Sequence, residues 1–399
     1  MNVQSVAYRI CEQLNSKGDK TAIVIDGQSY SYGFIKKRVA AFGRPLQEQS
    51  EVEQCIGLHL QNTIECYIGL IAIMISGRTF VPLNEDFGQR QLLHIIESAN
   101  VSKVIQSAQT DFFEEFKAKS NFDTIQVESE LLDEPLTCIQ STSAYVLFTS
   151  GSTGSPKGVP ITHDNLNHFI FAMTTEMEWS LNEDDKFLQP FSLSFDLFVM
   201  CVYLPLFLGA SLYTTPLEKR ALNSAALMDS EGITVCVLVP SSMRIINNIS
   251  SSLTFKSLRY AFFCGEPLYE SDLKSWNKLC PNSTSINIYG PTEGAVVCMR
   301  FILNQENVNQ VESGIIPIGI PFGKNEISFH EDEKGTEILI GGPQVFSGYM
   351  GDVESPFIEK NERNYYRTGD YCKKDKWGNL IFIGRKDEQL QLVSQEPFF

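Results

Sequence analysis

The sequence is short of positive charge and of long apolar runs, and each shortage excludes a class of protein. With 32 lysines and arginines against 48 aspartates and glutamates, its net charge is −16, which repels nucleic acid and anionic lipid. Residues 195–212 come closest to a continuous apolar run, but Asp196 and Pro205 interrupt it before it reaches membrane-spanning length. We therefore expect no nucleic-acid partner and no membrane insertion.

Paired cysteines are also missing. The ten cysteines stand singly without a Cys-x-x-Cys pair, and several lie in apolar runs, as Cys236 does, which is typical of reduced and buried thiols. Residues 1–5 lack the charged and then apolar segments of a signal peptide. These features predict a cytoplasmic protein.

Strands alternate with helices along most of the chain, which is the pattern of an α/β protein with largely parallel sheets. An Asp26-Gly27 pair between two short β-like runs predicts a hairpin near the start. From about residue 315 the pattern changes to short strands with glycine turns. We expect a core of residues 1–387, made of α/β subdomains at about 1–140 and 141–314 and a β-rich subdomain at about 315–385, followed by a tail at 388–399.

Residues 149–159 carry the strongest local signal. They follow a buried strand at 144–148 and precede a helix for which Thr162 is a possible N-cap. Glycines let the backbone approach an anion, hydroxyls and exposed amides donate hydrogen bonds, and an ammonium offsets charge. The segment therefore predicts a polyphosphate-binding loop formed by Thr149, Ser150, Gly151, Ser152, Thr153, Gly154 and Lys157.

This segment has two other interpretations. A flexible Ser/Gly linker has a similar composition, although it seldom follows a buried strand so closely. The common P-loop needs a Ser or Thr after its lysine, whereas Lys157 precedes Gly158. Residues 149–159 instead resemble the phosphate loop of the adenylate-forming superfamily, which includes acyl-CoA synthetases, luciferases and the adenylation domains of peptide synthetases. The resemblance implies that ATP and Mg²⁺ activate a carboxylate as an acyl-AMP, with release of pyrophosphate.

Further motifs of that family follow in order. Residues 287–293 resemble its adenine and metal segment, which implies that Tyr289 stacks on adenine, Asn287 bonds its amino edge, and Gly290 lies beside both ligands. By the same resemblance Thr292 meets the α-phosphate and Glu293 holds Mg²⁺, so that Thr149, Lys157, Thr292 and Glu293 form the catalytic set. Gly265 and Glu266 are assigned to the nucleotide as well. A Gly-Pro turn with a surface acid is the alternative for residues 287–293.

A third motif pair lies near the end of the chain. Residues 366–370 and 383–387 resemble the ribose-binding segments of the family, which implies that Asp370 and Arg385 hold the ribose and that Asp387 is a hinge. A carboxylate can accept both hydroxyls of a cis-diol. The alternative is a set of charges at solvated strand ends.

Asp196 points to the substrate class. It is the one acid in an otherwise apolar run, and burying an unpaired carboxylate is costly. In amino-acid-activating members of the family, an aspartate after phenylalanine at this place binds the substrate α-ammonium. The alternative is that Asp196 caps the helix from Leu197.

By the same resemblance, the amino-acid pocket is lined, apart from Asp196, by uncharged residues, most of them bulky. The runs 195–200 and 262–268 resemble those of D-alanine–carrier protein ligases and their glycine-activating relatives, in which a cysteine at the Cys264 position crowds the side-chain site. A small amino acid, glycine or alanine, is therefore expected. The residues assigned to this site are Asp196, Leu197, Met200, Ser242, Phe262, Cys264, Ile288, Gly290, Val296 and Val297.

The expected reaction is ATP-dependent adenylation of that amino acid and its transfer to the phosphopantetheine thiol of a carrier protein. Four alternatives stay open: core packing around a differently placed pocket, another apolar amino acid such as proline, an acyl-CoA ligase, and a non-catalytic nucleotide-binding module. The last is suggested because family members continue into a C-terminal subdomain with a catalytic lysine, and Gln391 stands where a basic residue often follows the hinge. We expect the chain to be the N-terminal core of a longer protein.

Overall fold

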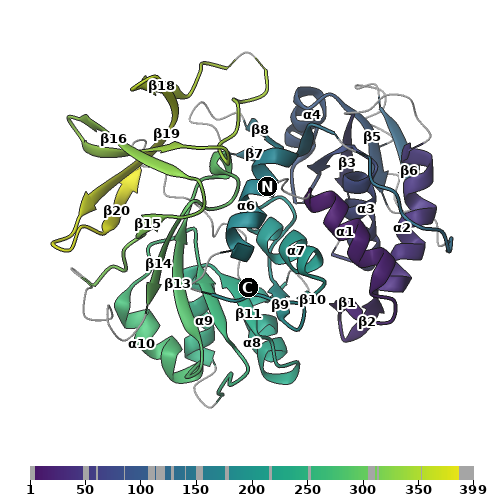
Figure 1. Cartoon of the computed structure of the whole chain (residues 1–399), viewed down its shortest axis with the longest axis horizontal. Coiled ribbons are helices and arrows are strands. Elements are labelled where there is room, and N and C mark those ends of the chain that lie inside the picture. Colours follow the sequence, from purple (N-terminus) through teal and green to yellow (C-terminus); the bar gives the residue numbers. More distant parts are fainter. Residues whose placement is uncertain are drawn as a thin grey trace.

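A computed structural model describes the chain from residue 5 to residue 385 with several gaps. The described residues are 5–47, 54–59, 62–84, 86–106, 113, 122–126, 130–139, 141–149, 156–175, 179–214, 218–249, 253–303, 311, 314–351 and 353–385. Within these ranges the protein contains three sheets and the helices that cover them (Figure 1). None of the described helices is long and apolar enough to cross a membrane.

The first sheet has six strands. All neighbours are parallel except the last pair, which forms an antiparallel hairpin. The strand order is β6 (Asp123–Gln126), β5 (Val101–Gln106), β3 (Cys55–His59), β4 (Thr79–Pro82), β7 (Ser143–Thr149) and β8 (Lys157–Thr162).

The second sheet has nine strands, parallel in its centre and antiparallel at both edges. The expected α/β class with largely parallel sheets is confirmed. The order is β15 (Ile320–Pro321), β14 (Met299–Leu303), β13 (Thr284–Tyr289), β12 (Tyr260–Phe263), β11 (Val235–Leu238), β9 (Lys186–Gln189), β10 (Ser211–Thr214), β1 (Thr21–Ile25) and β2 (Gln28–Ser31).

The third sheet is antiparallel and lies at the upper left of Figure 1. Its long central strand β19 pairs with three others and carries the Tyr366–Asp370 motif. The strands are β16 (Glu326–Asp332), β17 (Gly335–Gly341), β18 (Phe357–Lys360), β19 (Arg363–Lys374) and β20 (Leu380–Arg385).

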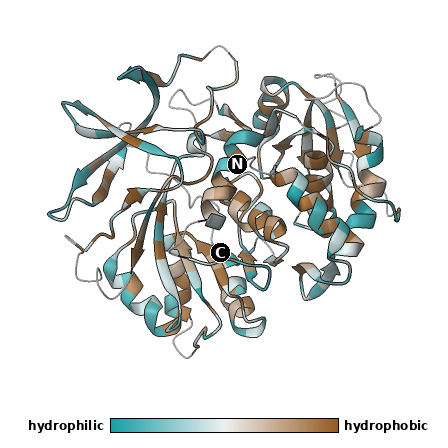
Figure 2. Ribbon diagram, in the orientation of Figure 1, coloured by the Kyte–Doolittle hydropathy of each residue, from teal (hydrophilic) through white to brown (hydrophobic). Residues whose placement is uncertain are grey.

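Two helices are apolar on all sides, which is typical of helices buried between sheets. They are α3 (Ile64–Ile75) and α7 (Leu197–Leu208); α7 packs on α1 (Val6–Ser16) and on β9, β10 and β11. Figure 2 shows brown, apolar residues along these helices and the strands. The remaining helices are α2 (Tyr32–Gln47), α4 (Gln89–Ser98), α6 (His163–Thr175), α8 (Arg220–Ser230), α9 (Pro240–Ile249), α10 (Glu270–Leu279) and the 3₁₀ turn η1 (Thr292–Gly294).

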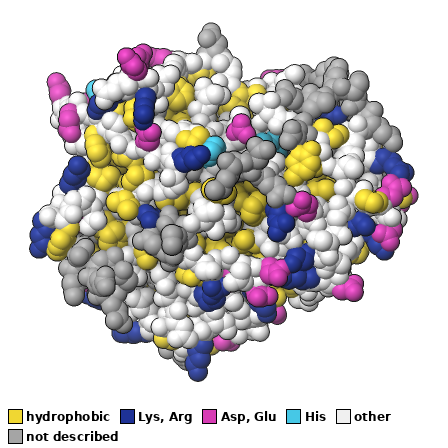
Figure 3. Space-filling view, viewed as in Figure 1, with side chains coloured by type: hydrophobic (Ala, Val, Ile, Leu, Met, Phe, Trp, Pro, Cys, Tyr) yellow, Lys and Arg dark blue, Asp and Glu magenta, His cyan; other side chains and the backbone are white. Residues whose placement is uncertain are grey.

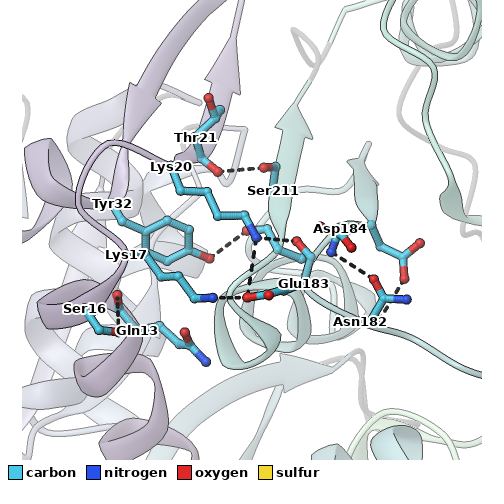
Figure 4. Close-up of polar contacts among 12 residues, drawn as sticks. Gln13, Ser16, Lys17, Lys20, Thr21, Tyr32, Asn182, Glu183, Asp184 and Ser211 are labelled. Carbon is cyan, nitrogen blue, oxygen red and sulfur yellow. Dashed lines mark hydrogen bonds and ion pairs between the residues drawn. The ribbon is translucent and has the colours of Figure 1, made fainter.

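The sheets do not divide at residue 140, where the sequence suggested a subdomain boundary. Strands β1 and β2 belong to the second sheet, whereas β7 and β8 belong to the first. The N-terminal segment is tied to the second sheet by polar contacts (Figure 4): the Tyr32 hydroxyl donates to the carbonyl of Ala210 at 2.6 Å, and Ser211 Oγ donates to the carbonyl of Thr21 at 2.6 Å. Local sequence patterns identify strands but not their distant partners, so the sequence did not predict which sheet these four strands join.

The ten cysteines are free thiols, and most of them are buried, as their isolated positions in apolar runs predicted. On the face seen in Figure 3, acidic and basic side chains of the described residues are interspersed and do not form a patch of one sign.

Candidate functional site

The predicted phosphate loop joins the two strands of the β7–β8 hairpin. Thr149 ends β7, Lys157 begins β8, and the two residues are partners in the register. Ser150, Gly151, Ser152, Thr153 and Gly154 lie outside the described residues. The sequence predicted that the loop leads into a helix, but β8 intervenes. This strand was missed because Gly158 and Pro160 weaken its signal; proline is tolerated there because β8 is an edge strand.

The helix after β8 begins as expected. Thr162 Oγ1 accepts a hydrogen bond from the amide of Asn165 at 3.1 Å, and Asn165 Oδ1 accepts one from the amide of Thr162 at 3.0 Å. This reciprocal pair is a capping box with asparagine in the third position. It fixes the direction in which α6 leaves β8.

Lys157 lies over an aromatic ring. Its Nζ is 5.1 Å from the ring centroid of Tyr349, a distance at which the ring face attracts a cation. The amide of Met350 donates to the carbonyl of Gly158 at 2.9 Å, which keeps this segment beside β8. The neighbouring ring therefore orients the lysine at the base of the predicted phosphate loop.

Glu293 is buried, with 7% of its surface exposed, so the alternative of a turn with a surface acid is wrong. The Tyr349 hydroxyl donates to Glu293 Oε1 at 2.7 Å and lies 3.3 Å from the hydroxyl of Tyr366. Burial and the Glu293 charge raise the pKa of Tyr349, so its hydroxyl stays protonated.

The described residues contain no cluster of three or more metal-ligating side chains. A Mg²⁺ ion at Glu293 would therefore have one protein carboxylate and take its other ligands from phosphate and water. That is the usual mode of Mg²⁺ binding beside nucleotides, so the donor set fits.

Asp196 contacts the second motif directly. Thr292 Oγ1 donates to Asp196 Oδ2 at 2.8 Å, and no ion pair to Asp196 is present among the described residues. Burial, partly offset by the Thr292 bond, raises the pKa of Asp196 to about 7. The side chain makes no capping hydrogen bond to α7, so the alternative role of helix cap is not supported.

Nine of the ten residues assigned to the amino-acid pocket are buried and Gly290 is half-buried; the apolar ones share one cluster. Leu197, Met200, Phe262, Cys264, Ile288, Val296 and Val297 belong to it, and Ser242 on α9 is 9% exposed. Burial, and to a smaller extent the Asp196 charge, raises the pKa of the Cys264 thiol, which keeps it neutral.

The predicted nucleotide residues on β13, β19 and β20 meet at one place. Tyr289 donates its hydroxyl to Asp370 Oδ2 at 2.6 Å, and Arg385 Nη1 lies 3.2 Å from Asp370 Oδ1. Asp370 and Arg385 are partners across the β19–β20 pair. Asn287 Nδ2 donates a hydrogen bond to the carbonyl of Pro317 at 2.8 Å. This bond fixes the orientation of the side-chain amide and leaves Oδ1 as an acceptor. Asp387 lies outside the described residues.

Gly265 and Glu266 differ from the other assigned residues. Glu266 accepts hydrogen bonds from the Ser241 amide at 2.9 Å and the Ser241 hydroxyl at 2.6 Å, and it pairs with Arg244 at 3.3 Å. The Glu266 carboxylate thus accepts hydrogen bonds from the first turn of α9, an arrangement that the sequence did not indicate. Gly265 has a φ of +88°, which favours glycine. Their nucleotide contact stays a prediction.

Sequence reasoning missed the segment 342–350, which lies between these motifs. Gln344 Nε2 is within 3.1 Å of the carbonyl oxygens of Gly294, Ala295 and Val297, and Tyr349 contacts both Lys157 and Glu293. The only local signal is a Gly-Gly-Pro-Gln run followed by Ser-Gly-Tyr. It predicts turns but not their contacts.

Comparisons with known proteins identify the family of the chain. A family model described as AMP-binding enzyme matches residues 10–350. The chain is 28% identical over 392 residues to Delta-poly-L-ornithine synthetase of Acinetobacter baumannii, covering 94% of this chain and 28% of that protein. It is 27% identical over 400 residues to the D-alanine–D-alanyl carrier protein ligase of Lacticaseibacillus paracasei, covering 94% and 76%.

Among solved structures, the Vibrio cholerae adenylation domain AlmE in complex with glycyl-adenosine-5'-phosphate superimposes with a TM-score of 0.80 at 23% identity. The match covers 97% of this chain and 80% of that one, and shows that the fold is shared. The chain spans less than a third of the synthetase from Acinetobacter baumannii.

Proposed function

We propose that this chain, which belongs to the AMP-binding enzyme family, activates a small amino acid with ATP to aminoacyl-AMP for transfer to the phosphopantetheine thiol of a carrier protein. The observation that carries the proposal is Asp196. Its carboxylate is buried, accepts a hydrogen bond from Thr292 and has no ion-pair partner among the described residues. An α-ammonium group would supply the missing charge, which makes an amino acid the fitting substrate.

A small substrate is supported by the walls of the same site. The buried cluster around Cys264 is apolar and uncharged, so a charged side chain would find no partner there. The ligase from Lacticaseibacillus paracasei is named for D-alanine, and the AlmE structure contains a glycyl adenylate. Glycine and alanine are therefore our first candidates.

The nucleotide would lie across the three sheets. Asp370 and Arg385 face the ribose, Tyr289 and Asn287 the adenine, and Lys157 with the hairpin loop the β- and γ-phosphates. Mg²⁺ at Glu293 would neutralise phosphate charge. An oxygen of the amino-acid carboxylate forms a bond to the α-phosphorus while the bond to the leaving pyrophosphate breaks, and the protein contributes by positioning and charge stabilisation.

The first test is amino-acid-dependent ATP–pyrophosphate exchange with glycine, both alanines, serine, proline, leucine and phenylalanine. We expect exchange with the smallest amino acids and a loss of about a hundredfold or more in Asp196→Asn, because a buried ammonium loses its counter-charge. Asp375→Asn is the matched control. Asp375 is similarly buried but serves a turn, where it accepts hydrogen bonds from the amides of Trp377 and Asn379.

Each other outcome identifies an alternative. Exchange with proline, leucine or phenylalanine would show that the pocket wall is misplaced. Exchange with a small acid that lacks an amine, unaffected by Asp196→Asn, would indicate an acyl-CoA ligase. ATP binding without exchange, repeated with a C-terminally extended chain, would indicate a nucleotide-binding module.

A further inference from the structure

The segment 342–346 connects two parts of the candidate site. On one side, Asn165 Nδ2 donates to the carbonyls of Pro343 at 2.8 Å and Val345 at 3.0 Å. Asn165 belongs to the capping box directly after β8, the strand that begins with Lys157. On the other side, the amide of Phe346 donates to the carbonyl of Glu293 at 2.8 Å.

Gln344 is at the centre of this connection and is 2% exposed. Its Oε1 accepts a hydrogen bond from Asn325 Nδ2 at 2.9 Å, which fixes which end of the amide is the donor. Its Nε2 then faces the carbonyl oxygens of Gly294 at 2.8 Å, Ala295 at 3.1 Å and Val297 at 2.5 Å. The two N–H groups of one side chain are therefore shared among three carbonyls of a single turn.

That turn has a conformation that its residues rarely adopt. Ala295 has a φ of +51° and Val296 a φ of +81°, and a β-branched residue in this region is strained. Such backbone persists only where surrounding contacts hold it, because it costs free energy. The turn follows Thr292 and Glu293 and carries Val296 and Val297 into the apolar cluster.

We propose that Gln344 is a positioning residue that determines amino-acid specificity by holding the Ala295–Val296 turn. Through this turn it fixes the wall formed by Val296 and Val297 and the hydrogen bond from Thr292 to Asp196. Gln344 itself contacts neither the nucleotide nor the amino acid. The specificity role rests on the proposed function, whereas the role in holding the turn does not.

The test compares Gln344→Met with Gln13→Met. Both changes keep the side-chain volume and remove a buried amide; Gln13 is also 2% exposed, and its Nε2 donates to the carbonyl of Phe207 at the α1–α7 contact (Figure 4 shows Gln13). The first readout is hydrogen–deuterium exchange of residues 290–300. The amides of Gly294, Ala295 and Cys298 donate hydrogen bonds to the carbonyls of residues 291, 292 and 289 and should exchange faster only in Gln344→Met.

The second readout is a comparison of Michaelis constants. In Gln344→Met we expect the KM for the amino acid to rise about tenfold or more, and to rise more than the KM for ATP, because the pocket wall is loosened and the ribose site is not. Asn325→Ala should act in the same direction, and the double variant should be no worse than Gln344→Met, because both changes affect one hydrogen-bond chain.

Unchanged deuterium uptake at 290–300 in Gln344→Met would overturn the proposal, and so would an equal rise of both Michaelis constants. If Gln344→Met does not fold, Asn325→Ala decides by the same two readouts. If the native chain activates no amino acid, the proposed function fails, and deuterium uptake alone still decides whether Gln344 holds the turn.

Discussion

The hydroxyl of Thr292 donates a 2.8 Å hydrogen bond to Asp196, so the residue predicted to meet the α-phosphate also contacts the residue predicted to meet the substrate ammonium. This bond connects the proposed nucleotide site with the proposed amino-acid site. Asp196 is buried and has no ion-pair partner among the described residues. Its ionisation is therefore sensitive to whether a cation binds in the proposed amino-acid site. The first two predictions follow from that.

Amino-acid affinity should fall in mild acid. Burial raises the pKa of Asp196 to about 7, so in the empty site its carboxylate is protonated below that pH and ionised above it. An ammonium binds the ionised form, and the amino-acid KM should therefore rise about tenfold for each pH unit below 7. Steady-state exchange between pH 5.5 and 8.5 measures this. A flat profile down to pH 5.5 would contradict it.

Replacing Asp196 should stabilise the empty protein at high pH. The pKa is about 7 in the folded state, above the ordinary value of 3.8, so the folded protein binds the extra proton and its stability falls as pH rises from about 4 to about 7. Asp196→Asn removes this penalty, which is about 4 kcal/mol at most. Urea unfolding should show the variant more stable than the native chain at pH 8 but not at pH 4. Equal stabilisation at both pH values would point to a cause other than ionisation.

Gly290 should tolerate no side chain. A Cβ there would lie 2.5 Å from Val297 Cα and 2.8 Å from the carbonyl oxygen of Val296, and both contacts are with backbone. Gly290→Ala should therefore destabilise the fold by about 1–3 kcal/mol, the usual cost of overpacking. Gly294→Ala is the control, because its Cβ would meet Pro291 at an ordinary 3.6 Å. Thermal unfolding of the two variants distinguishes them; equal melting temperatures would mean that the turn can move aside.

Tyr289→Phe should weaken ATP binding. The change keeps the aromatic ring but removes the hydroxyl that bonds Asp370, which leaves the proposed ribose carboxylate less well positioned. Loss of a hydrogen bond to a charged group is expected to raise the Kd for ATP by about tenfold. Tyr371→Phe is the control, because it removes a bond of the same 2.6 Å length to Asp332 on a different part of the third sheet. Calorimetric titration with ATP measures both, and equal losses would refute a specific role for Tyr289.

Much of this fold could be predicted because its signals are local. The Asp26-Gly27 pair marks the β1–β2 hairpin, and Thr162 marks the start of α6, as expected. Asp370 and Arg385 are likewise found side by side, although their ligand remains a prediction. In contrast, nothing near Gln344 in the sequence indicates three carbonyls some 50 residues earlier. Such contacts depend on the tertiary fold and have no periodicity of their own.

The pairing of β1 with β10 has a consequence for synthesis of the chain. Ile23 lies opposite Leu212, so 212 − 23 = 189 further residues must be made before this strand can meet its partner. At ribosomal rates this takes about 10 to 40 s. During that interval the apolar run Ala22–Ile25 can pair only with β2. The nascent chain therefore exposes an incomplete sheet edge while these 189 of the 399 residues are made, and a segment ending near residue 140 would not complete either α/β sheet.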